Sequence, residues 1–139
     1  MKTILAILEK AGGWHHGLSL SIENPPFMAL VIEATDESGP CGLPVVSVAH
    51  YGEQNGDLMR DPEMCFELSN PLGLGRNLVP FYWCNDYLGV EQYSRTIEGD
   101  HYLFSRELYD QHVKFAQQWD RNLRDQGFLE AFERNPTRR

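Results

Sequence analysis

Residues 44–68 read PVVSVAHYGEQNGDLMRDPEMCFEL, a polar segment enclosed by two apolar ones. The first apolar segment, Pro44–Tyr51, is rich in β-branched residues, which suit a buried pleated strand and predict a central place in a sheet. In the second, Glu63–Leu68, acidic and apolar residues alternate, a period of two that predicts a strand with one buried face. The stretch therefore predicts two strands of one sheet.

The polar segment between these strands contains Asn55-Gly56, a strong hairpin-turn signal because both residue types tolerate positive φ angles. A tight turn needs only two to five residues, whereas about eleven separate the two predicted strands. We therefore expect a long polar loop from His50 to Glu63. Loops that are positioned by buried strands often carry function, so this loop is the first candidate site.

The N-terminal part of the chain predicts a helix followed by a hairpin. Thr3–Ala11 has an apolar stripe at helical spacing, and Gly12-Gly13 is placed to end it. Leu18–Ile22 alternates apolar and polar residues, and Phe27–Ala34 is more continuously apolar. We expect these two segments to pair, with the second lying deeper in the sheet.

The C-terminal part predicts further strands and a long helix. Pro80 lies inside an aromatic segment, where its missing N–H indicates an edge strand or a bulge. Ser105 is placed to cap a helix from Arg106 to about Gln126. The expected extended segments in this part are Leu78–Cys84, Val90–Ile97 and His101–Phe104.

These elements predict an α+β fold. The connections between the strands are too short for helical crossovers, so the sheet should be mostly antiparallel, with about five to seven strands. We expect the short N-terminal helix and the long C-terminal helix to pack on it. The length of 139 residues fits a single domain, 1–139, in which residues 135–139 form a frayed tail.

The composition restricts the classes of partner. With 20 Asp and Glu against 12 Lys and Arg, the formal net charge is −8, which disfavours direct binding to nucleic acid or to an anionic membrane and favours a basic protein partner. Three widely spaced cysteines predict free thiols in a reducing compartment. The chain lacks a long apolar run, so we expect a cytoplasmic protein.

The polar segment contains the residue types of a metal or acid–base site. His50, Glu53, Asp57, Asp61 and Glu63 are residue types that bind Mg²⁺, Mn²⁺ or Ca²⁺. However, Asp57 and Asp61 are four residues apart, and side chains at this spacing converge only in a helical turn. We therefore predict no metal ligands and no cofactor. The motifs of nucleophilic enzymes are missing, and we assign no catalytic residue.

A second polar cluster, Asn85-Asp86-Tyr87, follows the aromatic strand. Asn and Asp often form turns by binding nearby backbone N–H groups, which is the simplest interpretation. If the sheet brings this cluster beside the central loop, the two would form one polar pocket. The aromatic residues expected around it are Tyr51, Tyr82, Trp83 and Tyr87.

The two polar segments also carry a resemblance. The chain resembles a domain family of unknown function from bacterial plasmids, phages and integrative elements, in which a Tyr-x-x-Gln-Asn-Gly-Asp-x-Met-x-Asp-Pro-Glu loop and an Asn-Asp-Tyr cluster recur. The resemblance implies a mobile-element setting, in which some small acidic proteins inhibit host defence by binding a protein and others serve conjugation or replication. It implies no activity and no catalytic residues. The matching positions are Tyr51, Gln54, Asn55, Gly56, Asp57, Met59, Asp61, Pro62, Glu63, Asn85, Asp86 and Tyr87.

We therefore expect a non-enzymatic binding or accessory protein of a mobile element, monomeric or weakly dimeric. Its partner would be a protein of basic character, such as a nucleic-acid-binding host protein. The alternative is a small metal-assisted or acid–base enzyme, hydrolase-like, that uses the His50–Glu63 loop. The expected binding residues are His50, Tyr51, Glu53, Gln54, Asn55, Asp57, Arg60, Asp61, Asn85, Asp86 and Tyr87.

Overall fold

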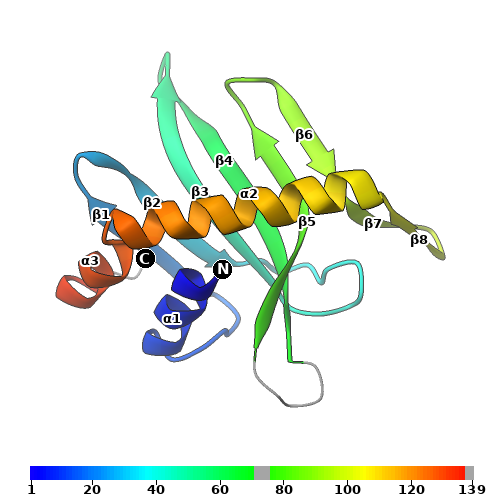
Figure 1. Cartoon of the computed structure of the whole chain (residues 1–139), viewed down its shortest axis with the longest axis horizontal. Coiled ribbons are helices and arrows are strands. Elements are labelled where there is room, and N and C mark those ends of the chain that lie inside the picture. The colour runs from blue at the N-terminus through cyan, green and yellow to red at the C-terminus, as the bar shows by residue number, and fades with distance from the viewer. Residues whose placement is uncertain (71–75, 137–139) are drawn as a thin grey trace.

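A six-stranded antiparallel sheet forms the centre of the computed structural model, which describes residues 1–70 and 76–136 (Figure 1). The spatial order of its strands is the order in the chain, β1 to β6, so each strand pairs antiparallel with the next one in the chain. This confirms the predicted α+β class and the antiparallel sheet. The strands are β1 Ser19–Asn24, β2 Phe27–Ala34, β3 Val45–Gln54, β4 Asp57–Ser69, β5 Asn77–Asn85 and β6 Val90–Tyr93.

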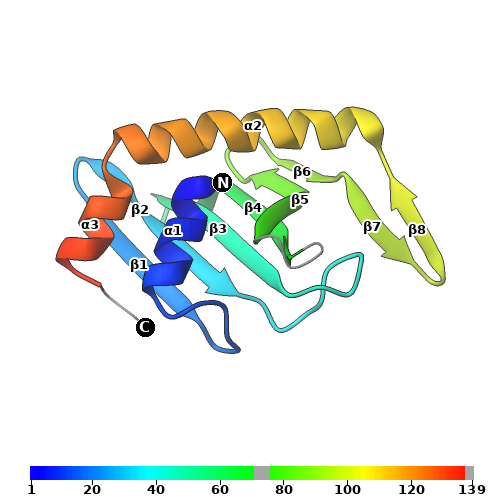
Figure 2. The ribbon, with the colours of Figure 1, turned by 60° about the horizontal axis from the view of Figure 1, so that its bottom comes forward.

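Three helices cover one face of this sheet (Figures 1 and 2). They are α1 Lys2–Lys10, α2 Arg106–Asp125 and α3 Phe128–Arg134. Helix α2 runs along the sheet from a separate two-stranded hairpin, β7 Arg95–Glu98 with β8 His101–Phe104, to the β1–β2 end. Ser105 caps α2 as predicted, because its Oγ accepts a hydrogen bond from the Leu108 N–H at 3.3 Å. Of the expected frayed tail, residues 137–139 lie outside the described chain.

The hydrophobic core lies between the sheet and the helical layer. Phe66 and Met64 of β4 are fully buried at the middle of the sheet, beneath Trp119 and Leu123 of α2 and Phe128 of α3. Each such side chain stabilises the fold by about 1.5–3 kcal/mol through burial. In the described part of the chain, no helix is long and apolar enough to cross a membrane.

The long polar loop predicted for His50–Glu63 is wrong, because both strands continue through it. β3 extends to Gln54 and β4 begins at Asp57, leaving a two-residue turn with φ angles of 53° at Asn55 and 85° at Gly56. The hairpin reaches past the helical layer (Figure 1), so neither face of its end has to be apolar. Backbone hydrogen bonds between β3 and β4 stabilise the extended conformation there. This part of the hairpin therefore does not need the alternation of apolar and polar residues that a buried face requires.

Strand β5, which contains Pro80, lies between β4 and β6, but its pairing with β6 runs only from Tyr82 to Asn85 and does not reach Pro80. The predicted bulge is confirmed. Cys65 pairs with Tyr82 while its neighbour Phe66 pairs with Pro80, which leaves Phe81 as an extra residue. The bulge accommodates the missing proline N–H and re-aims the aromatic side chains around it.

The face of the sheet away from the helices, called the open face below, is partly covered by residues 35–44. The carboxylate of Glu67, which is 0 % exposed, accepts hydrogen bonds from the backbone N–H groups of Cys41 at 2.9 Å and Leu43 at 3.1 Å. The other carboxylate oxygen pairs with the guanidinium of Arg95. This buried ion pair fixes the connection between β2 and β3 against the sheet.

Two buried histidines predict a pH dependence of stability. Burial lowers the pKa of His50, which packs against Trp119 and Phe128, and also that of His112, whose ring nitrogens contact Ser94 and Gln92. As the pH falls, the unfolded chain therefore binds protons at these histidines before the folded chain does. Their contribution to the free energy of unfolding is complete above pH 6.5 and is lost as the pH falls from there through the lowered folded pKa.

We expect the free energy of unfolding, measured with urea, to fall between pH 7.5 and pH 5.5. His112→Asn should reduce this dependence, whereas His101→Gln at an exposed position should leave it unchanged. An unfolding free energy that does not vary over this range in the wild type would contradict the prediction.

Candidate functional site

Arg60 of β4 joins the two hairpins that meet at one end of the sheet. Its guanidinium binds Asp86 through two parallel hydrogen bonds, Nε to Oδ2 and Nη2 to Oδ1, both of 2.9 Å. Its backbone N–H also donates to Asp86 Oδ2 at 2.7 Å, and its carbonyl accepts from the Asp86 N–H at 2.9 Å. This paired arrangement is strong and directional, so it holds the β5–β6 turn against the β3–β4 hairpin.

The contacts of Arg60 extend onto the open face. Its Nη1 donates to Glu63 Oε1 at 3.3 Å and to the hydroxyl of Tyr82 at 3.2 Å, and the same hydroxyl donates to Glu91 Oε2 at 2.6 Å. We call Arg60, Glu63, Tyr82 and Asp86 the arginine lock. The hydrogen bond from Arg60 lowers the pKa of Asp86, whereas burial raises the pKa of Tyr82. Both groups therefore keep their usual charge states at neutral pH.

Two further hydrogen bonds join the hairpins beside the lock. Asn85 Nδ2 donates to Asp61 Oδ1 at 2.8 Å, and the Tyr87 hydroxyl donates to the Glu53 carbonyl at 3.4 Å. Asn85 also closes its own turn, since its Oδ1 accepts from the Leu88 N–H at 3.2 Å. Thus the sheet brings the Asn-Asp-Tyr cluster beside the central polar segment, as the sequence analysis considered.

The tyrosine of this cluster sits against a glycine. A Cβ atom added to Gly52 would lie 2.3 Å from the hydroxyl oxygen of Tyr87, so a side chain there would displace the ring. Most of the other predicted binding residues lie at the same end of the sheet. Gln54, Asn55 and Asp57 form the hairpin turn, and Tyr51 lies opposite Arg60 in β3.

Two residues that the sequence grouped with this site lie on the other face of the sheet. His50 is buried in the core, where its Nδ1 lies 3.1 Å from the Ala29 carbonyl. Trp83 packs edge-on against Phe115 of α2, with ring centroids 5.6 Å apart, so the expected aromatic ring around one pocket is wrong at this position. Strand parity explains both, because His50 follows Val46 and Val48 on the face toward the helices.

Two exposed apolar residues at the hairpin ends, Leu58 and Leu88, are not among the residues that the sequence predicted to bind. Leu58 is 72 % exposed, Leu88 is 68 % exposed and the neighbouring Tyr87 is 44 % exposed. We call these exposed residues at the ends of two neighbouring hairpins, Leu58 in β4 and Tyr87 and Leu88 in the β5–β6 turn, the tip surface; Glu53 and Asp57 of the β3–β4 hairpin are also exposed. The sequence did contain a signal for them, because Leu58 is two residues from Gly56 and Leu88 is next to Gly89. An apolar residue so close to a turn glycine lies at the end of a hairpin, away from the core.

A hollow of about 260 Å³ lies on the open face between residues 35–38 and strands β5 and β6. Its walls include Glu63 and Tyr82 of the arginine lock, and also Phe81 and Tyr93. Burial raises the pKa of the Cys65 thiol beneath it and that of Cys84 nearby, so both stay protonated and are poor nucleophiles. All three cysteines are free thiols, and Cys41 is the exposed one among them.

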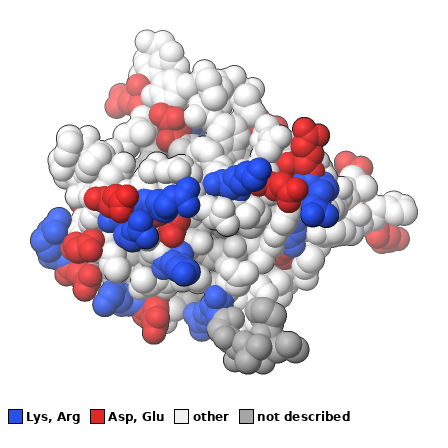
Figure 3. Space-filling view, viewed as in Figure 1, with Lys and Arg blue, Asp and Glu red and all other residues white. Residues whose placement is uncertain are grey.

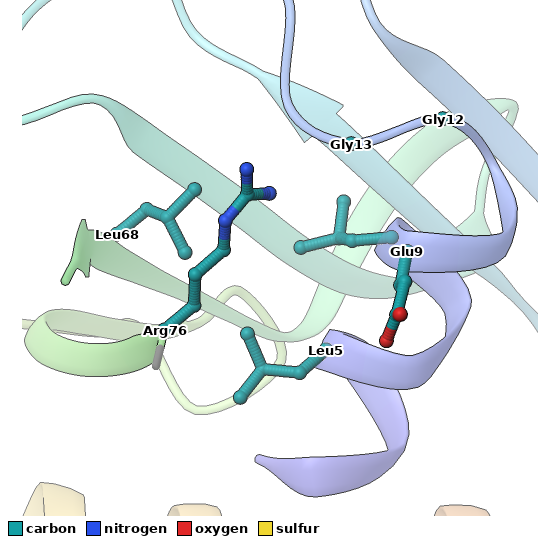
Figure 4. Close-up of a pocket in the computed structure, with 7 residues that line it drawn as sticks. Leu5, Glu9, Gly12, Gly13, Leu68 and Arg76 are labelled. Carbon is teal, nitrogen blue, oxygen red and sulfur yellow. The ribbon is translucent and has the colours of Figure 1, made fainter. Parts of the chain in front are cut away.

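A larger hollow of about 590 Å³ lies beside α1, where Leu5 and Leu68 flank the side chain of Arg76 (Figure 4). Arg76 directly follows residues 71–75, which lie outside the described chain, so we assign no site to this hollow. Within residues 1–70 and 76–136, no group of three or more His, Cys, Asp or Glu side chains is arranged to hold a metal ion.

Comparison with known families places this geometry in context. Residues 2–129 match the model of the family described as domain of unknown function DUF6908. The chain belongs to this family. No curated protein and no solved structure matches this DUF6908 domain.

The charge of this DUF6908 domain is unevenly divided between its layers. The three helices carry seven basic and seven acidic residues, which alternate along the helical face (Figure 3). The strands and connections hold the other thirteen carboxylates, while the basic residues described there are Arg60, Arg76 and Arg95. The negative charge of the domain is therefore concentrated in the sheet and its connections.

Proposed function

We propose that this chain is a non-enzymatic binding protein that docks a basic protein segment on the tip surface and the adjacent acidic strands. The observation that carries the proposal is the pair of hairpin ends held together by Arg60 and Asp86 while Leu58, Tyr87 and Leu88 stay exposed. Leu58 lies in β4, and Tyr87 and Leu88 lie in the β5–β6 turn that Asp86 holds against β4. Apolar side chains held in this way are suited to act as anchors, because little conformational entropy is lost when they bind.

The charge distribution supports a basic partner. Arg60 and Arg95 are already paired with carboxylates, so the surplus negative charge of the strands is left for a partner to neutralise. Complementary charge accelerates association and excludes acidic partners. We also propose that the protein is cytoplasmic and is monomeric or weakly dimeric. From the sequence resemblance, we propose that it serves a plasmid, phage or integrative element.

The enzyme alternative has weaker geometric support. His50, the only imidazole among its acid–base candidates, is buried on the face opposite the arginine lock. The carboxylate of Glu63 accepts hydrogen bonds from Ser47 at 2.5 Å and Arg60 at 3.3 Å, and both neighbouring thiols are protonated. An acid–base pair would need a donor and an acceptor within reach of one substrate atom.

The experiment that tests the proposal places a photo-crosslinking amino acid at position 58 and, as a control, at exposed Gln117 on the helical face. In cells of the native host, we expect one basic protein to crosslink at position 58 and not at position 117. Equal capture at both positions, or capture of acidic proteins only, would overturn the proposal.

With the captured partner purified, Leu58→Ala and Tyr87→Ala should each weaken binding by about 30-fold, the effect of a central anchor residue. Gly52→Ala should weaken it as well, since it displaces Tyr87 without touching the partner. Gln118→Ala on α2 is the matched control and should bind like the wild type. Unchanged affinity in all three tip variants would contradict the proposed surface.

A further inference from the structure

The hollow on the open face has aromatic walls. Tyr82 and Tyr93 lie in adjacent strands with ring centroids 4.8 Å apart and planes inclined by 54°. Phe81 lines the same hollow although it is the direct neighbour of Tyr82 in the chain. Successive residues of a regular strand point to opposite faces, so it is the bulge at Pro80 that brings both rings to one cavity.

Carboxylates stand beside these rings. Glu63 of β4 and Asp36 and Glu37 of the β2–β3 connection line the hollow, and Glu91 beside it accepts a hydrogen bond from the Tyr82 hydroxyl. Burial, followed by the charges of Glu91 and neighbouring groups including Glu37, raises the pKa of Tyr93. In the described part of the chain, no Lys or Arg forms an ion pair with Asp36 or Glu37.

The aromatic faces and acidic rim together match one chemical group. An aromatic ring attracts a cation over its face, and a planar guanidinium both stacks on rings and pairs with carboxylates. We propose that this hollow is a subsite for an arginine side chain of the partner. This inference rests on the proposed function, and it adds a defined ligand group to the acidic surface.

The subsite is continuous with the tip surface. Tyr82 lines the hollow and bonds to Arg60, which bonds to Asp86 at the hairpin ends. Leu58 lies two residues before Arg60 in β4 and therefore on the same face of the strand. A segment that lies across the open face can place an arginine in the hollow while an apolar residue next to it contacts Leu58. The ion pair of Glu67 and Arg95 holds the β2–β3 connection that forms one wall.

The test uses N-acetyl-arginine amide as the probe and N-acetyl-citrulline amide as its uncharged counterpart of nearly the same shape. In titrations followed by ¹H–¹⁵N spectra, we expect millimolar binding of the arginine probe, with shifts confined to the amides of residues 35–38, 63, 81, 82 and 93. The citrulline probe should bind at least several-fold more weakly. Equal binding of both probes, or arginine shifts spread over the whole acidic surface, would overturn the inference.

Two variants identify the groups that recognise the probe. Tyr93→Leu removes an aromatic face, and Glu37→Gln removes a charge; both residues are exposed, so the fold should be retained. Each should weaken arginine binding several-fold, whereas Leu58→Ala at the tip should not change it. If the wild type does not bind the arginine probe but still crosslinks at position 58, the subsite alone is rejected. If the wild type binds the probe but does not crosslink at position 58, the tip surface alone is rejected.

Discussion

Replacing Glu67 with alanine is expected to lower the free energy of unfolding by about 3–5 kcal/mol, the cost of removing one partner from a buried ion pair. Arg95 is only 6 % exposed, and without Glu67 its charge would remain in the interior with only neutral acceptors, such as the Pro80 carbonyl at 3.3 Å and the Tyr102 hydroxyl at 3.0 Å. The N–H groups of Cys41 and Leu43 would also lose their acceptor. Unfolding in urea at neutral pH measures the change.

The double variant Glu67→Leu/Arg95→Met measures how much of this loss in unfolding free energy comes from leaving the charge of Arg95 buried without a partner. Replacing a whole buried ion pair with apolar side chains of similar volume is often nearly neutral, so the double variant should recover most of the lost stability. It should not restore the wall of the hollow, because the two backbone N–H groups still lack their acceptor. A single variant that costs less than about 1 kcal/mol would show that the pair is not buried as described.

The second large effect is expected at Arg60. Arg60→Met should lower the free energy of unfolding by about 1–2 kcal/mol, a value reduced from that of a buried charged hydrogen bond because 34 % of the side chain is exposed. It should also weaken partner binding as much as loss of a tip residue does, since the paired hydrogen bonds between Arg60 and Asp86 join the two hairpins. Urea unfolding and the affinity for the captured partner are the two measurements.

A double-mutant cycle with Asp86→Asn measures the coupling between these two residues. Since the folded pKa of Asp86 lies below its ordinary value of 3.8, the stabilisation is present above pH 3.8 and is lost as the pH falls through the lowered pKa. The difference between wild type and Arg60→Met should therefore shrink in strong acid. Additive effects of the two substitutions at neutral pH would contradict the proposed lock.

The candidate site was only partly predictable from the sequence. The turn at Asn55-Gly56 was correctly located because positive φ angles restrict the residue types allowed there. Yet the polar residues around that turn were interpreted as a loop, since a strand that reaches beyond the core needs no apolar alternation. His50 was assigned to the site although its period-two relation to Val46 and Val48 pointed to the core.

The pairings that define the site depend on strand neighbours. Arg60 and Asp86 are 26 residues apart, and Glu67 and Arg95 are 28 apart. They meet because β4 pairs with β5, and because the chain after β6 turns back toward β4. Local sequence carries no signal for such contacts, so the sequence could name the polar residues without saying which carboxylate each cation would bind.

By itself, the sequence determined the elements, namely the β-branched strands, the Asn-Gly turn and the helix that begins after Ser105, together with the acidic net charge. These follow from local backbone preferences and from side-chain periodicity. Only the tertiary structure decided which face of the sheet each side chain occupies and which side chains pair with each other. It buried His50 and Trp83 under the helices, neutralised Arg60 and Arg95 with distant carboxylates, and left Leu58 and Leu88 exposed, because strand order and register fix which side chains can reach each other.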